Sequence, residues 1–496
     1  MKFDHNKNRS VSALLLLSML AAGLASCGDT SGDTGTVTDN TAATEAVTEA
    51  VTEDPALRDS LPEIDLGGYQ YRMAVFGTDI QRIMTYNDAE DGNIVNDAVY
   101  HKIRTVEERF NTDIVLAEIS KEEDDQVGVL KSAIMAGDDS CEIAQGHDVN
   151  LGNASLEGLF VNAYDIPYLD FSKPWWLPET LESMTVAGQM YMMFNNISYS
   201  NLAQMRVMYF NKEMMQALDF EYPYQMVYDG TWTLDAMKQM TAAAYSDLNG
   251  DGTRDEEDRF GYVNMPNYYG MLEPFHVEPY RKDNNGTLYY EVDLERTTEV
   301  VEKFYDLIFG EGGYLMPRKY EDYSTRVLNM VSEGRSMFFY GSLDHAVYTF
   351  SDTDFVFGVL PMPKLDASEE GYYGGSFDRP FVVPTTAQNL EYLGIVTEAL
   401  NAEGYKQVYP AFYEIAMKTR YADQTDDAKM IDIVHNNVII SFTYLFGDFK
   451  SIFNMMWDLF NKTPTTDVAS WCAKNEKAQT KRVEKLMTFF EEHRSS

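Results

Sequence analysis

The sequence is poor in cysteine and in basic residues, and both shortages exclude classes of protein. Only three of its 496 residues are cysteine, so no disulfide framework holds the fold together. Cys141 and Cys472 could form one long-range disulfide outside the cell, although isolated cysteines are more often unpaired core residues. Lys and Arg total 39 against 79 Asp and Glu, a formal charge of −40. This charge argues against a nucleic-acid partner, because such binding depends on neutralising phosphates.

Common catalytic motifs and internal repeats are also missing. The chain has no Gly-x-Ser-x-Gly elbow, no His-Glu-x-x-His and no phosphate-binding loop ending in Gly-Lys-Ser/Thr. A surface adhesin would show repeats or β-sandwich spacing. A secreted glycan-degrading hydrolase stays open as an alternative, because two carboxylates about 5–10 Å apart are enough for that reaction. We expect a binding protein rather than an enzyme.

The apolar run near the start is too short to span a membrane. It extends from Val11 to Leu24 behind a short basic stretch, whereas a spanning helix needs about 20 residues. This order is typical of an export signal, here residues 1–26. Leu24-Ala25-Ser26-Cys27 resembles the lipobox of bacterial lipoproteins, which implies that Cys27 becomes the N-terminus and carries the lipid. An ordinary secretory signal with an incidental cysteine is the alternative.

Residues 27–65 contain no aromatic residue and are rich in Thr, Ala, Asp and Glu. Such a segment cannot bury a core, so we expect a disordered, charge-extended tether. Behind a lipid-bearing cysteine, a tether lets a soluble domain move above the membrane. We therefore expect a location at the cell membrane, lipid-anchored on the extracytoplasmic face.

From residue 66 the chain alternates strand-like and helical patterns. Strand-like runs at 69–76, 113–117 and 142–145 enclose amphipathic helices at 95–110 and 124–136. This alternation predicts a mostly parallel sheet flanked by helices, with ligands at the carboxyl ends of its strands. About 430 residues are too many for one core, so we expect two lobes. A second set of elements comprises a strand at 205–210 and helices at 234–245, 297–309, 321–333, 388–402 and 475–492.

Several motifs in a fixed order resemble the extracellular solute-binding proteins of family 1, which serve ABC-type sugar importers. The most specific is DGTWTLDAMKQMTAAAYSDLNGDGTRDEEDRFGY at 229–262. The others are MYFNKEM at 208–214, VSEGRSMFFYGS at 331–342, FGVLPMP at 357–363, and a Gly-Gly turn, strand and helix over 374–400. Many members of the family have Trp two residues after the glycine of the Gly-Ser turn, where this chain has Leu343.

The resemblance implies an α/β fold of the periplasmic-binding-protein (Venus flytrap) type. Each lobe would be a mostly parallel sheet flanked by helices, with chain crossovers at a hinge near residues 196, 340 and 385. The lobes would comprise residues 66–195 with 341–384, and 196–340 with 385–496. A monomer of this type captures a carbohydrate, here expected to be an oligosaccharide, and delivers it to the transmembrane subunits of an ABC permease. A solute-binding protein for a non-sugar solute is the nearest alternative.

The loop from Asp247 to Asp258 has the ligand order of an EF-hand. Oxygen-bearing side chains stand at positions 1, 3, 5, 9 and 12 and a glycine at position 6, while position 7 offers its backbone carbonyl. Position 12 is Asp rather than the usual Glu. The loop therefore predicts a structural Ca²⁺ site, and a polar turn without metal is the alternative. The expected ligands are Asp247, Asn249, Asp251, Thr253, Asp255 and Asp258.

Carbohydrates are bound by aromatic rings that stack on their C–H faces and by polar side chains that bond their hydroxyl groups. Residues of both kinds occur in the loops after the expected strands and near the expected crossovers. Core packing is the alternative for the two tryptophans, and solvated loops or surface ion pairs are the alternative for the charged residues. The candidates are Glu90, Asp91, Asn93, Trp175, Trp176, Gln204, Arg206, Tyr340, Ser342, Asp344, Asp378 and Arg379.

Overall fold

A computed structural model describes residues 57–119, 126–266, 268, 271–350, 353–376, 379–418, 424–447 and 451–493. The contacts divide the chain between Arg58 and Asp59, and every element below belongs to the unit that begins at Asp59. The expected export signal, Cys27 and the tether up to residue 56 lie outside the described residues.

The end of the expected tether is part of the folded unit. Asp59 forms an ion pair with Arg109, with 2.6 Å between Oδ2 and Nη1, and this arginine holds the pKa of Asp59 below its usual value although burial opposes the shift. Leu61 and Ile64 pack against the core. The predicted boundary at residue 65 is therefore too late, because these two apolar side chains have a core to enter.

The first sheet has the order β12-β3-β1-β2. Its strands are β1 (Tyr69–Val75), β2 (Thr112–Leu116), β3 (Ile143–Gln145) and β12 (Phe381–Val382). β1 is parallel to β2 and to β3, while β12 is antiparallel to β3. The strands and helices predicted from the alternating pattern are confirmed, with α3 (Ile94–Phe110) and α4 (Gln126–Met135) between the parallel strands.

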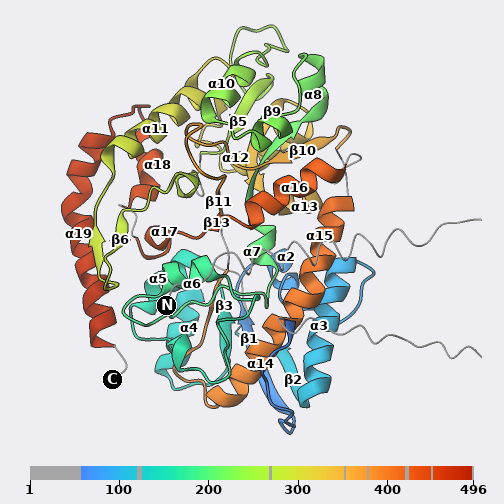
Figure 1. The fold of residues 1–496 in the computed structure, drawn as a ribbon, viewed down its shortest axis with the longest axis vertical. Helices are drawn as coiled ribbons and strands as arrows, with labels where there is room; N and C mark the ends of the chain where they lie inside the picture. Colours follow the sequence, from blue (N-terminus) through green and yellow to red (C-terminus); the bar gives the residue numbers. More distant parts are fainter. Residues whose placement is uncertain are drawn as a thin grey trace, which may run out of the picture. The chain divides into compact units, whose positions relative to one another are not determined.

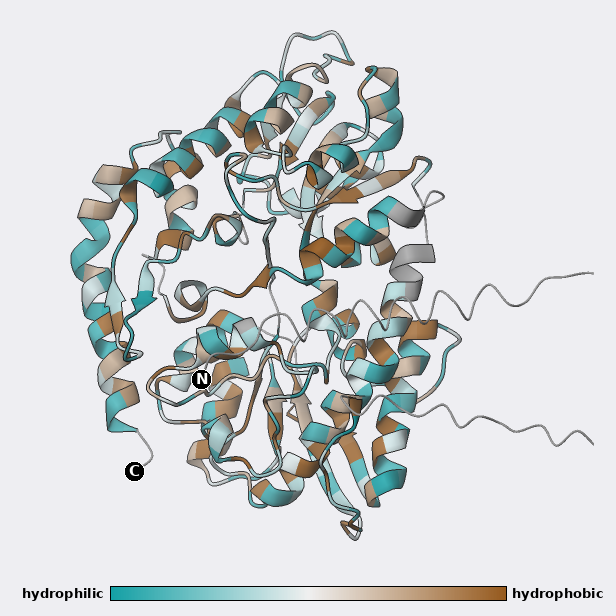
Figure 2. Cartoon of the chain, viewed as in Figure 1, coloured by the Kyte–Doolittle hydropathy of each residue, from teal (hydrophilic) through white to brown (hydrophobic). Residues whose placement is uncertain are grey.

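Helix α3 shows why the pattern was predictive. Asn93 caps its first turn by accepting hydrogen bonds from two backbone amides. Val99, Ile103, Val106 and Phe110 are at most 1% exposed, and they lie at the three- and four-residue spacing of one helix face. The helix ends at Asn111, which takes the left-handed conformation with φ of 48°. Figure 2 shows hydrophilic and hydrophobic residues on each of the larger helices.

The second sheet has the order β10-β4-β9-β5-β8. Its strands are β4 (Arg206–Asn211), β5 (Phe260–Asn264), β8 (Gly313–Leu315), β9 (Ser336–Ser342) and β10 (Phe357–Leu360). β5 is parallel to β8 and β9, whereas β4 is antiparallel to both β9 and β10. This sheet is more mixed than predicted, because the chain enters it through β4 in the opposite direction.

For two elements, β10 and α14, the lobe predicted from the sequence is wrong. Residues 341–384 were expected in the first lobe, but β10 pairs with β4 of the second sheet. Residues 385–496 were expected in the second lobe, but α14 (Leu390–Glu403) packs on α3 and β1, and Thr397 shares a buried hydrogen bond of 2.8 Å with the Tyr71 hydroxyl. The crossings expected near residues 340 and 385 are therefore wrong.

The chain passes between the sheets around three segments, of which the first follows the crossing expected near residue 196. The first precedes β4, where Met205 bridges to Ser376. The second is β11 (Gly374–Gly375), which leads back to β12 and runs parallel to β13 (Val438–Ile439). The third is the π-helical segment η5 (Gly404–Val408), which joins α14 to α15 (Tyr409–Lys418). Figure 1 shows β11 and β13 between the two sheets.

The remaining elements cover these sheets. Trp232, two residues before α10, is fully buried, and its indole donates to the Pro361 carbonyl. The helices are α2 (Asp79–Ile83), α5 (Asp148–Ser155), α6 (Pro178–Met184), α7 (Ser200–Ala203), α8 (Lys212–Ala217), α9 (Tyr224–Tyr228), α10 (Leu234–Ala242), α11 (Leu294–Phe309), α12 (Tyr323–Ser332), α13 (Asp344–Tyr348), α16 (Gln424–His435), α17 (Phe442–Phe446), α18 (Met455–Phe460) and α19 (Val468–Glu492). The short segments are η3 (Ala163–Asp165), η4 (Glu273–Phe275), η6 (Ile452–Asn454) and the hairpin β6 (Tyr280–Lys282) and β7 (Leu288–Tyr290).

Cys141 and Cys472 are both free; the first is buried and the second half-buried. This matches the unpaired alternative. Within the described ranges, none of the helices combines the length and the apolar character needed to cross a bilayer.

Candidate functional site

The carboxyl ends of several strands meet at one edge of the second sheet. β5, β8 and β9 are parallel neighbours, so they end at the same edge. Arg206 at the start of β4 is paired with Ser342 at the end of β9, and therefore lies there too. This edge adjoins the first and second crossing segments, since Met205 bridges to Ser376. Ligands in α/β folds bind at such edges.

Five of the candidate residues come together at this edge. The Gln204 amide donates to Asp344 Oδ2 at 2.6 Å, and the Ser342 hydroxyl donates to the other oxygen of Asp344. Burial lowers the pKa of Arg206, opposed by its charge interactions with Tyr340 and Asp344. Burial likewise raises the pKa of Tyr340. The cluster combines donors, acceptors and one half-buried cation, a set that can bond hydroxyl groups.

Arg379 lies at the corresponding edge of the first sheet. Its Nη1 donates to the carbonyl of Phe76, the residue after β1, at 3.0 Å. The carbonyl of Arg379 accepts from the Gln145 amide at the end of β3. A Cβ at Gly77 would stand 2.6 Å from Gln81 Oε1 and 3.2 Å from Arg379 Nη1, so these two side chains lie close against the loop after β1. Asp378 lies outside the described residues.

Trp175 and Trp176 are both fully buried, which leaves neither ring a surface for stacking on a ligand. Their indole nitrogens donate to the two oxygens of Glu398 on α14, at 2.8 and 3.1 Å. Burial raises the pKa of Glu398 to about 8, although the two indole hydrogen bonds oppose the shift. The structure places both tryptophans in the core, in agreement with the alternative named from sequence.

Glu90, Asp91 and Asn93 form the exposed turn that leads into α3. Asp91 accepts from the backbone amide of Asn93 and from the side chain of Asn96. The hydrogen bond from Asn96 is the main reason why the pKa of Asp91 is lowered. The Glu90 carboxylate lies 2.9 Å from His101 Nε2. These partners are local, so the structure accounts for all three residues by helix capping and a surface contact.

The Asp247–Asp258 loop closes on itself through its own carboxylates. Asp247 accepts from the amides of Gly250 at 2.6 Å and Gly252 at 2.9 Å. Gly252, at position 6, has φ of +75° and open space where a Cβ would stand. Asp258 is fully buried and accepts from the Leu248 amide. Across the described part of the chain, no three His, Cys, Asp or Glu side chains converge as a metal site.

Four expected calcium ligands remain: Asn249, Asp251 and Asp255 accept from the loop backbone through their side chains, and Thr253 takes part through its backbone amide. Asn249 accepts from the Asp251 amide, and Asp251 in turn accepts from the Thr253 amide. Asp255 accepts from the Glu257 amide. Asp247, Asn249, Asp251 and Asp255 thus each accept from a backbone amide two to five residues further on.

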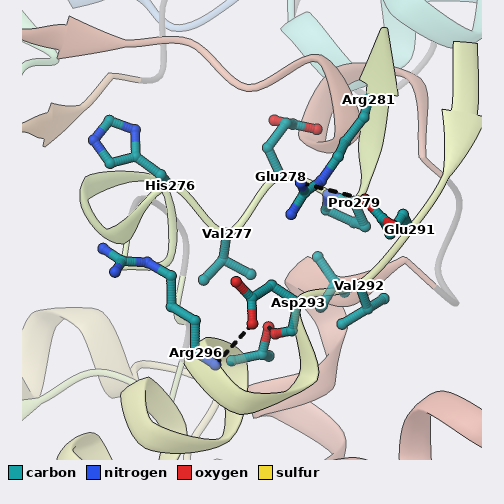
Figure 3. A pocket seen from close by; sticks show the side chains of 11 residues that line it. His276, Val277, Glu278, Pro279, Arg281, Glu291, Val292, Asp293 and Arg296 are labelled. Atoms are coloured by element: carbon teal, nitrogen blue, oxygen red, sulfur yellow. Dashed lines mark hydrogen bonds and ion pairs between the residues drawn. The ribbon is translucent and has the colours of Figure 1, made fainter. Parts of the chain in front are cut away.

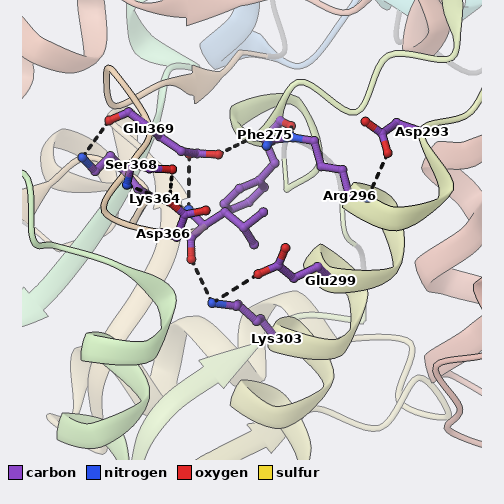
Figure 4. Close-up of polar contacts among 10 residues, drawn as sticks. Phe275, Asp293, Arg296, Glu299, Lys303, Lys364, Asp366, Ser368 and Glu369 are labelled. Atoms are coloured by element: carbon purple, nitrogen blue, oxygen red, sulfur yellow. Dashed lines mark hydrogen bonds and ion pairs between the residues drawn. The ribbon is translucent and has the colours of Figure 1, made fainter.

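The loop after β10 is fixed to α11 by charged contacts, which Figure 4 shows. Arg296 donates to the Glu369 carboxylate, and Lys364 donates to the Glu369 carbonyl at 2.9 Å. Lys303 donates to the Leu365 carbonyl at 3.0 Å. β10 ends at the same edge of the sheet as β9, so the loop that follows β10 begins at the edge that carries the candidate site.

A small pocket lies between η4, the β6–β7 hairpin and the start of α11 (Figure 3). Arg281 pairs with Glu291 at 3.3 Å, and Asp293 caps α11 by accepting from the Arg296 amide. Burial raises the pKa of Glu278 to about 8, and its carboxylate accepts from the Thr443 amide at 2.9 Å. We place the ligand site at the sheet edge instead, where the carboxyl ends of parallel strands meet the crossing segments.

One aromatic pair near this edge was not among the residues predicted from the sequence. Tyr348 on α13, after β9, is 38% exposed. Its hydroxyl lies 2.7 Å from that of Tyr199 in the first crossing, and the Tyr199 amide donates to the carbonyl of Met84 at the end of α2. Leu343, where many members of the resembled family have Trp, is 1% exposed. A tyrosine in a crossing segment could have been predicted as a ligand contact, but the chain has 33 tyrosines, so this feature alone does not single out Tyr199 or Tyr348.

Comparison with known proteins gives no match to a protein-family model and none to a curated protein. Solved structures do match. The substrate-binding protein Lmo0181 of Listeria monocytogenes, in complex with cycloalternan, has a TM-score of 0.53 at 10% identity, covering 85% of this chain and 100% of its own. The chain has the fold of an ABC-importer solute-binding protein.

Two further structures agree. The GacH receptor of Streptomyces glaucescens, solved unliganded and with acarbose, has a TM-score of 0.52 at 14% identity, covering 84% of this chain and 99% of its own. UgpB of Mycobacterium tuberculosis, in complex with glycerophosphocholine, has a TM-score of 0.53 at 13% identity over 85% and 99%. The two-lobed α/β fold predicted from the sequence motifs is confirmed.

Proposed function

We propose that the chain is the substrate-binding component of an ABC importer and binds a carbohydrate, expected to be an oligosaccharide, between its two lobes. The observation that carries the proposal is the polar cluster of Gln204, Ser342 and Asp344 at the crossing between the sheets. It stands where a ligand would touch both lobes. The matched structures support this class of ligand, since cycloalternan and acarbose are carbohydrates.

The proposed mechanism is a shift between open and closed arrangements of the lobes. A ligand that bonds Asp344 of the second lobe and the Arg379 region of the first completes its contacts only when the lobes are close. It thereby favours the closed arrangement. The closed form would then dock on the permease subunits as a monomer, held outside the membrane by a lipid on Cys27.

A thermal-shift screen tests this function. Mono- and oligosaccharides at 100 times their dissociation constant should add about 2.7 kcal/mol to the free energy of unfolding, seen as a higher melting temperature. Asp344→Ala should weaken the hit by about 10- to 100-fold, because a charge-assisted hydrogen bond is lost. Asp354→Ala, at an exposed aspartate, is the matched control and should leave affinity unchanged.

Two outcomes would contradict the proposal. A sugar consumed during incubation would favour the hydrolase alternative. No shift with any sugar, together with binding of another small molecule, would favour the non-sugar alternative.

We further propose that the Asp247–Asp258 loop binds Ca²⁺ as a structural clip. The order of its oxygen groups and the positive φ of Gly252 support the proposal. Adding chelator should lower the melting temperature, since a bound ion stabilises the folded state alone. Asp251→Ala should remove the difference between calcium and chelator, while Asp354→Ala should retain it. Equal melting temperatures with calcium and chelator, and no binding heat, would contradict the site.

A further inference from the structure

Trp457 differs from the other tryptophans of the chain. All five lie within the described residues, and four of them are at most 6% exposed: Trp175, Trp176, Trp232 and Trp471. Trp457, on α18, is half-buried instead. A partly exposed tryptophan offers a flat apolar face beside solvent, and such residues are enriched at binding interfaces.

Trp457 lies at the edge of the second sheet that carries the candidate site. Helix α18 packs on the loop that follows β5: the ring centres of Phe460 and Tyr268 are 5.6 Å apart, and the Asn461 amide donates to the Pro266 carbonyl. Arg318, three residues after β8, covers the Trp457 ring. β5 and β8 are parallel, so both loops lie at the carboxyl edge.

The Arg318 guanidinium is held by aromatic rings and not by an acid. Its carbon lies 3.7 Å from the centre of the Trp457 ring and 5.5 Å from that of Tyr323. Lys319 follows it and lies 5.0 Å from the centre of the Tyr320 ring. Within the described ranges, neither cation has a carboxylate within 4 Å. Arg326, by contrast, pairs with both Glu256 and Asp322.

The chain has two acidic residues for each basic one. An arginine stacked on an aromatic face keeps its N–H donors free around the rim of the guanidinium plane. The stack also fixes that plane, so less rotamer entropy is lost when a bidentate acceptor binds. The charge of the whole molecule repels anions only weakly here, because salt screens it beyond about 8 Å.

We propose that Arg318 and Lys319 recognise an anionic substituent of the carbohydrate, either a carboxylate or a phosphate. Arg318 donates two N–H groups to the anion, Lys319 adds a second charge, and Trp457 is a positioning residue that holds the guanidinium. The proposal deepens the carbohydrate-binding function and rests on it. It assigns the ligand to the acidic saccharides, such as uronates or sugar phosphates.

The test compares charged ligands with neutral partners of the same shape by titration calorimetry on the folded domain. The pairs are trigalacturonate with its methyl ester, and glucose 6-phosphate with glucose. We expect the charged member of at least one pair to bind about 10- to 100-fold more tightly, with an advantage that falls as NaCl rises. Arg318→Gln should reduce that advantage to less than threefold, and Arg318→Lys should restore part of it.

Controls separate this proposal from the function on which it rests. Lys477→Gln removes an exposed cation from α19 and should leave both affinities unchanged. Trp457→Phe should lower the preference for the charged ligand while neutral binding persists. Neutral sugars that bind as tightly as charged ones would overturn the anion site alone, as would an unchanged preference in Arg318→Gln. No binding by any sugar would overturn both proposals.

Discussion

Gly404→Ala is expected to cost about 3 kcal/mol or more of the free energy of unfolding and to abolish ligand binding. Gly404 begins the π-helical segment through which the chain leaves α14. A Cβ there would stand 1.8 Å from the carbonyl oxygen of Asn196 and 2.9 Å from its carbon. Both atoms belong to the backbone of the first crossing segment, so neither can rotate away. Two crossings between the lobes would have to separate.

Urea unfolding followed by circular dichroism measures this effect. Gly371→Ala is the matched control: the added Cβ would lie 3.4 Å from the Tyr373 ring, an ordinary contact with a side chain. It should change the free energy of unfolding by less than about 1 kcal/mol. A Gly404→Ala protein with the wild-type midpoint would show that the two crossing segments do not approach each other as the structure has them.

The local elements could be predicted because their causes are local. The strand expected at 69–76 is β1 at 69–75, and the helix expected at 95–110 is α3 at 94–110. Alternation of period two and a buried stripe at helical spacing are properties of the segment itself. The capping residues Asn93 and Thr233 likewise mark helix starts through their own side chains.

The assignment of elements to lobes could not be predicted in this way. β10 is a short apolar run that suits either sheet, and only its pairing with β4 decides. The placement of α14 depends on Glu398, whose two partners Trp175 and Trp176 lie more than 200 residues away. A buried carboxylate cannot be recognised in a sequence that contains 79 acidic residues.

The candidate site was predictable to the extent that it follows the crossings. Gln204 was chosen beside the expected first crossing, and the structure joins it to Asp344 by a hydrogen bond. Asp344 was chosen for a crossing near residue 340 that the structure does not have; it lies at the site because it follows the end of β9. The pair of Arg318 and Trp457 was missed, because it depends on the packing of α18 beside the end of β8. The adjacent cations Arg318 and Lys319 after a strand, in a chain short of cations, were the available signal.

Asp427→Ala is expected to destabilise the second lobe by about 3–5 kcal/mol, because it leaves a buried cation without its partner. Asp427 is fully buried, and its Oδ2 lies 2.8 Å from Lys212 Nζ. The Lys212 side chain is 9% exposed. Its Oδ1 accepts from the Tyr224 hydroxyl and, at 2.8 Å, from the Val359 amide. One carboxylate thus joins α8, α9 and β10 to α16. Urea unfolding of the variant measures the loss.

The double variant Lys212→Met/Asp427→Leu separates the charge from the packing. It replaces the ion pair with apolar side chains of similar size, so no charge stays buried, and it should recover much of the stability lost in Asp427→Ala. A single variant as stable as wild type would mean that water reaches Lys212. Because β10 leads into the loop held by α11, Asp427→Ala should also weaken ligand binding, whereas the double variant should restore it.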